Sequence, residues 1–113
     1  MIAYFTGGIY SNTGDLSKFV MAQFDDREKL LTMTQNKTFE VNKNLVIALG
    51  WHIVKQPNRD QLLWHNGGTG DYTSSIAIDL KNQKAVIILS NVSAFHPRQS
   101  NIDKLTFEIL KDL

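Results

Sequence analysis

Two strand-like runs joined by a short polar turn constrain the fold of this chain more than any other feature. Residues 72–80 alternate along an extended chain, with Ile76 and Ile78 on one side. Residues 81–84 then supply a polar turn. Residues 85–89 follow as a continuous, mostly β-branched run, which is typical of a strand buried on both faces. The pattern predicts an antiparallel strand pair.

Two further strands are expected upstream of this pair. Residues 45–54 and 62–65 form apolar or alternating runs, and the segment between them contains Pro57 and Asn58, which favour a turn. These runs predict a hairpin. Residues 35–44 are polar without a steady period, so we expect a connecting loop there.

Helical spacing of apolar residues occurs near the N-terminus. Asn12 is a suitable N-cap, with Asp15 in the first turn of the expected helix. An apolar stripe follows at helical spacing, made of Leu16, Phe19, Val20 and Phe24. A second, shorter helix is expected through residues 29–33, after Asp25 and Asp26.

A third helix is expected over residues 100–113. Its apolar residues fall on one face, and they are Ile102, Leu105, Ile109, Leu110 and Leu113. Ser100 and Asp103 have the spacing of a capping box. The order of elements predicts an α+β fold, in which an antiparallel sheet of about four strands is covered by N- and C-terminal helices.

Length and composition restrict the functions to consider. The 113 residues suit a single domain spanning 1–113, and the formal net charge of +1, with its basic residues scattered, does not favour a nucleic-acid partner. The absence of cysteine excludes disulfides, thiolate nucleophiles and cysteine-based zinc sites. His52, His65 and His96 are too widely spaced for a helical metal site, so neither a metal nor another cofactor is expected. The longest apolar run, 85–89, is far shorter than the roughly 20 residues of a membrane-spanning helix.

A glycine cluster marks the candidate site. Gly67, Gly68 and Gly70 follow an expected strand, where the absence of side chains lets a ligand approach the backbone. The alternative interpretation is a flexible turn between two strands. Trp51 and Trp64 fall on the neighbouring expected strands, which predicts a cross-strand packing pair.

Four separated segments resemble the serine β-lactamase-like and penicillin-binding protein family, which includes class C β-lactamases, D-alanyl-D-alanine carboxypeptidases and esterases. Together the segments cover nearly the whole chain and match the C-terminal portion of that fold. They are Gly7-Gly8-Ile9-Tyr10-Ser11 with Asp15-Leu16-Ser17-Lys18-Phe19, Leu49-Gly50-Trp51, Trp64-His65-Asn66-Gly67-Gly68-Thr69-Gly70, and Ile78-Asp79 with Val86-Ile87-Ile88-Leu89-Ser90-Asn91.

The resemblance implies a role for each residue of the third segment. His65 stands where many members carry a lysine, so a cation there would attract a substrate carboxylate and support proton transfer, although imidazole titrates near pH ~6.5. Gly68 would offer its backbone N–H to an oxyanion hole. Gly67 would stay small so that substrate adds to the strand edge, and Asn66 and Thr69 would hydrogen-bond substrate.

Three observations limit the resemblance. Asp71 replaces a frequent glycine, and its carboxylate would repel an anionic substrate, which argues against β-lactam recognition more than against ester or peptide hydrolysis. No serine has a lysine three positions later, so the nucleophile motif Ser-x-x-Lys is absent from this chain. Tyr10-Ser11-Asn12 matches the family's second motif, Tyr-x-Asn, but its neighbours match the later helix, so we assign Tyr10 to packing.

Two functional hypotheses follow. In the first, the chain is the C-terminal segment of a serine hydrolase, inactive alone, whose acyl substrate is a peptide, β-lactam or ester. In the second, it is a stand-alone, non-catalytic binding or interaction module derived from that fold. The resemblance also implies an extracytoplasmic location. In the family, N-terminal strands complete the sheet beside the C-terminal helix, so this segment would expose a sheet edge and an apolar helix face, for which a homodimer is a remedy.

Overall fold

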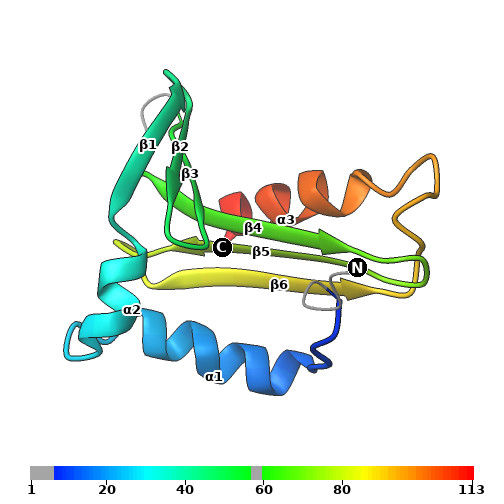
Figure 1. Ribbon diagram of the computed structural model, residues 1–113, viewed down its shortest axis with the longest axis horizontal. Helices are drawn as coiled ribbons and strands as arrows, with labels where there is room; N and C mark the ends of the chain where they lie inside the picture. The colour runs from blue at the N-terminus through cyan, green and yellow to red at the C-terminus, as the bar shows by residue number, and fades with distance from the viewer. Residues whose placement is uncertain (1–6, 57–59) are drawn as a thin grey trace, which may run out of the picture.

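A single antiparallel sheet carries the helices of this chain. A computed structural model describes residues 7–56 and 60–113, and the expected turn at Pro57 and Asn58 lies outside them. The described elements are α1 (Thr13–Gln23), α2 (Lys29–Thr34), β1 (Lys37–Asn42), β2 (Leu45–Ala48), β3 (His52–Val54), β4 (Leu62–Gly68), β5 (Thr73–Asp79), β6 (Lys84–Ser90) and α3 (Asn101–Asp112). The strands follow one another in the order β1-β2-β3-β4-β5-β6 (Figure 1). The α+β class is confirmed.

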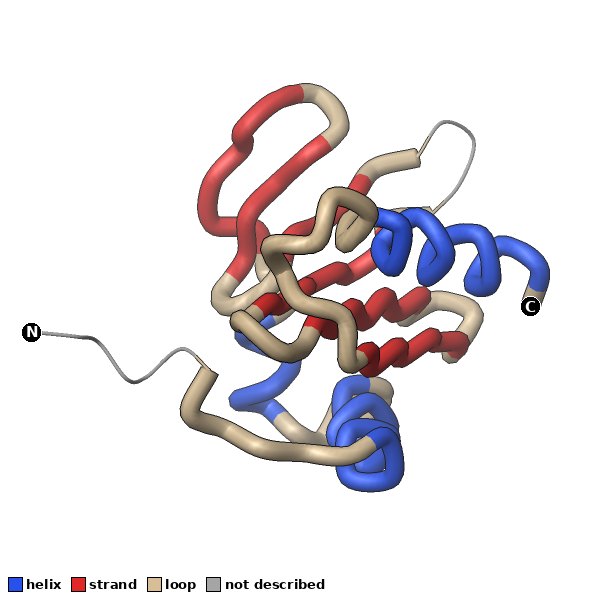
Figure 2. The backbone as a smooth tube through the Cα atoms, turned by 90° about the vertical axis from the view of Figure 1, so that its right-hand side faces the viewer, coloured by secondary structure: helices blue, strands red, loops and turns tan. Residues whose placement is uncertain are grey.

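The sheet is covered on both faces, because its strands alternate between two apolar clusters. One cluster joins Val20 of α1 to Ile53, Leu63 and Ile78, and we call this side the α1 face. The other joins Leu110 of α3 to residues of β4, β5 and β6, and we call it the α3 face. Figure 2 shows the two helices on opposite sides of the strands. Figure 1 shows β1, β2 and β3 rising away from the remaining strands.

Over residues 7–56 and 60–113 the sheet has six strands, more than the four or so expected. The polar segment 35–44 was expected to be a loop, but β1 occupies most of it and pairs with β2. Every residue of β1 is exposed, including its two apolar residues Phe39 and Val41, so the strand is held by pairing with β2 and not by burial of side chains. The run 45–54 is divided in two at Gly50, whose φ of +83° is a conformation that favours glycine. There Ala48 N–H donates to the carbonyl of Trp51 at 2.8 Å and closes the bend.

The strand β6 is an edge, which corrects the expectation that residues 85–89 are buried on both faces. It pairs with β5 alone within the described residues. Only Val86 of this run is buried, and Leu89 is 42% exposed. The polar turn before β6 is confirmed, and Asp79 stabilises it by accepting from the backbone N–H of Asn82 at 3.0 Å.

The helices at both ends of the chain are confirmed, with two corrections. Asn12 caps α1 by accepting from Asp15 N–H at 2.9 Å, but Tyr10 is 91% exposed and does not pack. In α3 the face toward the sheet is centred on Thr106 and Leu110, so most of the expected apolar stripe lies at its flank. Thr106 is tolerated there because its hydroxyl donates to the carbonyl of Ile102 at 2.7 Å.

Arg27 and Asp25 form an ion pair in the segment between α1 and α2, and its effect on the pKa of Asp25 can be measured. Arg27 binds Asp25 through Nε and Nη2, and these hydrogen bonds lower the pKa of the Asp25 carboxyl to about 2. Because the pKa is lowered, the pair contributes stability above the ordinary aspartate range and loses it as the pH falls through about 2. We expect the NMR titration midpoint of Asp25 to lie near 2 and to rise toward the ordinary value of about 3.9 in Arg27→Ala, although the backbone N–H of residue 27, which also lowers this pKa, remains. An unchanged midpoint would contradict the assignment.

No helix among the described residues is long and apolar enough to cross a membrane.

Candidate functional site

The glycine cluster begins at the C-terminal end of β4. The ladder between β4 and β5 extends to this end, whereas the ladder between β4 and β3 stops earlier. On the β5 side, pairing continues from Leu63↔Ile78 to Gly68↔Thr73. On the β3 side, pairing ends at His52↔Trp64. Within the described residues, positions 65–68 therefore have a strand partner on one side only. Backbone groups on such an edge are available to an added strand.

The side chains along this edge are solvent-exposed. His65, Asn66, Gly67 and Gly68 are all exposed, whereas Leu62 and Leu63 at the start of β4 are buried. The glycines are thus outside the core and at the surface, as a binding edge requires.

Gly68 also has a structural reason to be glycine. A Cβ at this position would lie 2.6 Å from Cβ of Ala94, in the loop after β6. That loop is tied to the end of β4, because Ala94 N–H donates to the carbonyl of Thr69 at 2.9 Å. A Cβ at Gly67 would meet Ser74 Oγ at 3.0 Å, which is tight, and one at Gly70 would meet open space. Close packing against Ala94 therefore favours glycine at position 68.

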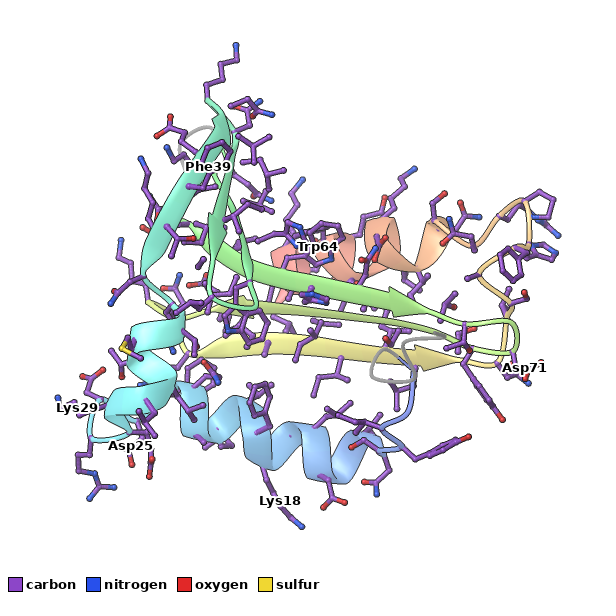
Figure 3. All side chains as sticks on the ribbon, in the orientation of Figure 1. Lys18, Asp25, Lys29, Phe39, Trp64 and Asp71 are labelled. Carbon is purple, nitrogen blue, oxygen red and sulfur yellow. The ribbon has the colours of Figure 1, made fainter. Side chains whose placement is uncertain are left out.

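Thr69 closes the turn between β4 and β5. Its N–H donates to the carbonyl of Tyr72 at 2.8 Å, and its Oγ1 accepts from Tyr72 N–H at 3.1 Å. Asp71 lies at the tip of this turn, beyond the sheet (Figure 3). The hydroxyl of Thr69 thus has a role in shaping the turn.

Asn66 is bound to the C-terminal helix. Its Nδ2 donates to Oδ2 of Asp103 in α3 at 2.8 Å. This contact corrects the expected capping box, because Ser100 makes no side-chain cap bond and Asp103 is directed to β4 instead. The second carboxylate oxygen, Oδ1, is buried and has no hydrogen-bond partner among the described residues. Asp103 therefore holds the Asn66 side chain from the α3 face of the sheet.

His65 packs against a second histidine. The ring centroids of His65 and His52 are 5.6 Å apart, and His52 in turn lies 5.2 Å from Trp64. Trp64 faces α3 (Figure 3), and its ring centroid lies 5.8 Å from that of Phe107. The row of rings ends at the exposed imidazole of His65.

The expected Trp51–Trp64 pair is wrong. The residue opposite Trp64 is His52, and Trp51 belongs to the cluster on the α1 face, where it stacks on Phe19 at 6.1 Å. Sequence reasoning missed His52 and Asp103 as neighbours of the site. The register of β3 with β4, had it been known, would have identified His52 as a neighbour of the site. No local sequence signal indicates Asp103.

Two cavities lie away from this edge. One of about 240 Å³ lies beside α3 and includes Asp60, Asp79 and Lys111 in its lining. The other, about 340 Å³, lies between α1 and β6. Among the residues that the structure describes, no three His, Cys, Asp or Glu side chains are grouped so that they could hold a metal ion.

Comparison with known proteins assigns a family to this arrangement. The family model described as Beta-lactamase matches residues 2–111. No curated protein matches the chain. The family match covers nearly the whole chain, including the exposed edge of β4, both flanking strands and all three helices. The chain therefore belongs to the beta-lactamase family of serine β-lactamase and penicillin-binding-protein-like hydrolases.

Proposed function

We propose that this chain supplies one wall of an acyl-substrate site in a serine hydrolase, and that it is inactive alone. The wall consists of the His-x-Gly box at residues 65–67 and the backbone N–H of Gly68 as one donor of an oxyanion hole. The attacking hydroxyl comes from a Ser-x-x-Lys segment outside the 113 residues of this chain.

The observation that carries this proposal is the one-sided pairing of β4. The pairing of β4 with β3 stops at Trp64, so within the described residues no strand lies along this side of His65 to Gly68. An extended acyl substrate would occupy that side. A peptide or peptide-like substrate would add as a strand, with main-chain hydrogen bonds to this edge. Glycines at 67 and 68 keep side chains away from the approaching backbone.

His65 and Gly68 have distinct proposed roles. The imidazole of His65, exposed and supported by His52, would act on the substrate carboxylate when it carries a proton. The N–H of Gly68 would stabilise the oxyanion, and one such donor is worth about 3–4 kcal/mol at a transition state. Asn66 donates one of its two side-chain N–H groups to Asp103, which leaves its carbonyl oxygen and its second N–H for substrate. Thr69 would contribute through its hydroxyl at the end of the edge.

Binding and hydrolysis by the isolated chain test the proposal. We expect no turnover of a chromogenic β-lactam or of p-nitrophenyl acetate. We expect an N-acetylated D-alanyl-D-alanine peptide to bind weakly, with a Kd of about 1 mM or above, and to shift the amide NMR signals of residues 65–69. His65→Ala should weaken this binding. His65→Lys should preserve it, because the ammonium group of lysine supplies a hydrogen-bond-donating cation at the same position.

Lys18→Ala is the matched control, since Lys18 is an exposed cation on α1, remote from β4 (Figure 3). It should leave peptide binding unchanged. Peptide-induced shifts confined to other strands would overturn the proposed site. Turnover by the isolated chain that His65→Ala abolishes would overturn the claim that it is inactive alone.

A further inference from the structure

Strand pairing brings together two of the three histidines of this chain. The spacing of His52 and His65 in the sequence excludes a helical metal site, but it does not exclude a site made by neighbouring strands. Strand β3 pairs with β4, and the ring centroids of the two histidines are 5.6 Å apart. Because both strands and their pairing lie within the described residues, this proximity is a property of the sheet itself.

The separation of the two rings fits coordination of one metal ion. In zinc sites the metal lies about 2.0–2.1 Å from the imidazole nitrogen, and therefore about 3.2 Å from the ring centroid. Two imidazoles at a tetrahedral angle around the metal then have their centroids about 5.2 Å apart. The observed separation of 5.6 Å is close to this value, and the ring planes are inclined at 43°, so the rings are not stacked face to face. A small rotation of one side chain would bring a nitrogen of each ring to a common ion.

One of the two rings is held in place and the other is free to turn. His52 is partly buried and packs against Trp64, with ring centroids 5.2 Å apart. Its Nδ1 is buried and has no hydrogen-bond partner among the described residues. A buried nitrogen without a partner is costly, and coordination to a metal ion would satisfy it. His65 is exposed, so its ring can turn to complete the pair.

We propose that His52 and His65 bind a divalent transition-metal ion of the Zn²⁺, Cu²⁺ and Ni²⁺ class at the edge of β4. Imidazole is a preferred ligand of these ions, whereas Mg²⁺ and Ca²⁺ prefer oxygen ligands. No third His, Cys, Asp or Glu is grouped with the pair among the described residues. Water or another external ligand therefore fills the remaining positions, so the site is open.

The position of this site links metal binding to the edge of β4. His65 lies on the edge that the proposed function leaves for substrate, so a metal ion and a substrate would reach the same imidazole. A bound metal takes the nitrogen lone pair that a proton would otherwise take. Metal occupancy and the protonated His65 of the proposed function therefore exclude each other, a consequence that rests on that function.

Isothermal titration of the 113-residue chain with ZnCl₂ tests the site. We expect one ion per chain, and we expect His52→Ala and His65→Ala each to weaken zinc binding by about 10-fold or more, because either change removes one of two ligands. His96→Ala is the matched control, since His96 lies in the loop after β6, where its Nδ1 accepts from Arg98 N–H at 3.1 Å. It should leave zinc binding unchanged. MgCl₂ should give no binding.

The imidazole NMR signals provide a second readout on the unaltered chain. Zn²⁺ should shift the ring signals of His52 and His65 together and leave those of His96 in place. Far-UV CD checks the fold of each variant, and His65→Ala, at an exposed position, keeps the test decisive if His52→Ala does not fold.

Three outcomes would overturn the metal site: no binding at about 1 mM ZnCl₂, binding retained in His65→Ala, or binding lost in His96→Ala. The proposed function is tested separately. Peptide binding at residues 65–69 without zinc binding would overturn the metal site alone. Zinc binding without peptide binding would overturn the proposed function alone.

Discussion

Ile78→Ala should lower the free energy of unfolding by about 2–5 kcal/mol, as large-to-small changes in a packed core do. Ile78 is fully buried in β5, at 0% exposure, and belongs to the cluster that joins the sheet to α1. The two strands on either side of β5 hold its backbone, so the surroundings cannot close around the lost side-chain volume. Urea denaturation followed by tryptophan fluorescence measures the change.

Leu30→Ala is the control for this prediction. Leu30 lies on α2 and is 76% exposed, so its truncation should change stability by less than about 0.5 kcal/mol. Equal losses from the two substitutions would mean that the α1 face of β5 is not the centre of the core.

Gly68→Ala should destabilise the chain by about 1–3 kcal/mol, because the new Cβ would overlap Ala94 Cβ at 2.6 Å. The next contacts of that Cβ are 3.7 and 3.8 Å, which are ordinary van der Waals distances. Removing the methyl group of Ala94 should therefore relieve the overlap. The double variant Gly68→Ala/Ala94→Gly should recover most of the loss, while Ala94→Gly alone should cost about 1 kcal/mol or less.

This double-mutant cycle separates the two reasons for glycine at position 68. Stability rescued by Ala94→Gly reports the close packing of the loop after β6. Peptide binding measured on the rescued double variant then reports whether an added methyl group obstructs the edge of β4. Additive losses in the cycle would show that Ala94 is not the group that excludes a side chain.

The sequence predicted those elements whose side chains have a buried face. The α1 stripe, the alternation in β5 and the apolar run of β6 are all visible in the residues, because burial selects the side chains at a fixed period. Strand β1 escaped prediction since all its side chains are exposed and its partners are backbone groups of β2. The division of residues 45–54 depended on one backbone angle at Gly50.

The candidate site was predictable only in part, for a related reason. The glycine cluster is local, so it could be found in the printed sequence. The supporting residues are not local, because His52 reaches His65 through the pairing of β3 with β4. Asp103 has the spacing of a helix cap, yet its carboxylate is hydrogen-bonded 37 residues away at Asn66. Tertiary contact overrode the local signal at that position.

The order of the strands in the sheet affects how quickly the chain reaches its native state. Strands that are consecutive in the chain are neighbours in the sheet, so every described ladder can form as a short-range hairpin. Sheets with such local connectivity have low contact order and fold quickly, since little loop entropy is lost before each pairing is made. The bond from Asn66 to Asp103 spans far more of the chain than any strand pairing does. We therefore expect the edge of β4 to become fixed late, after the hairpins have formed and α3 has docked.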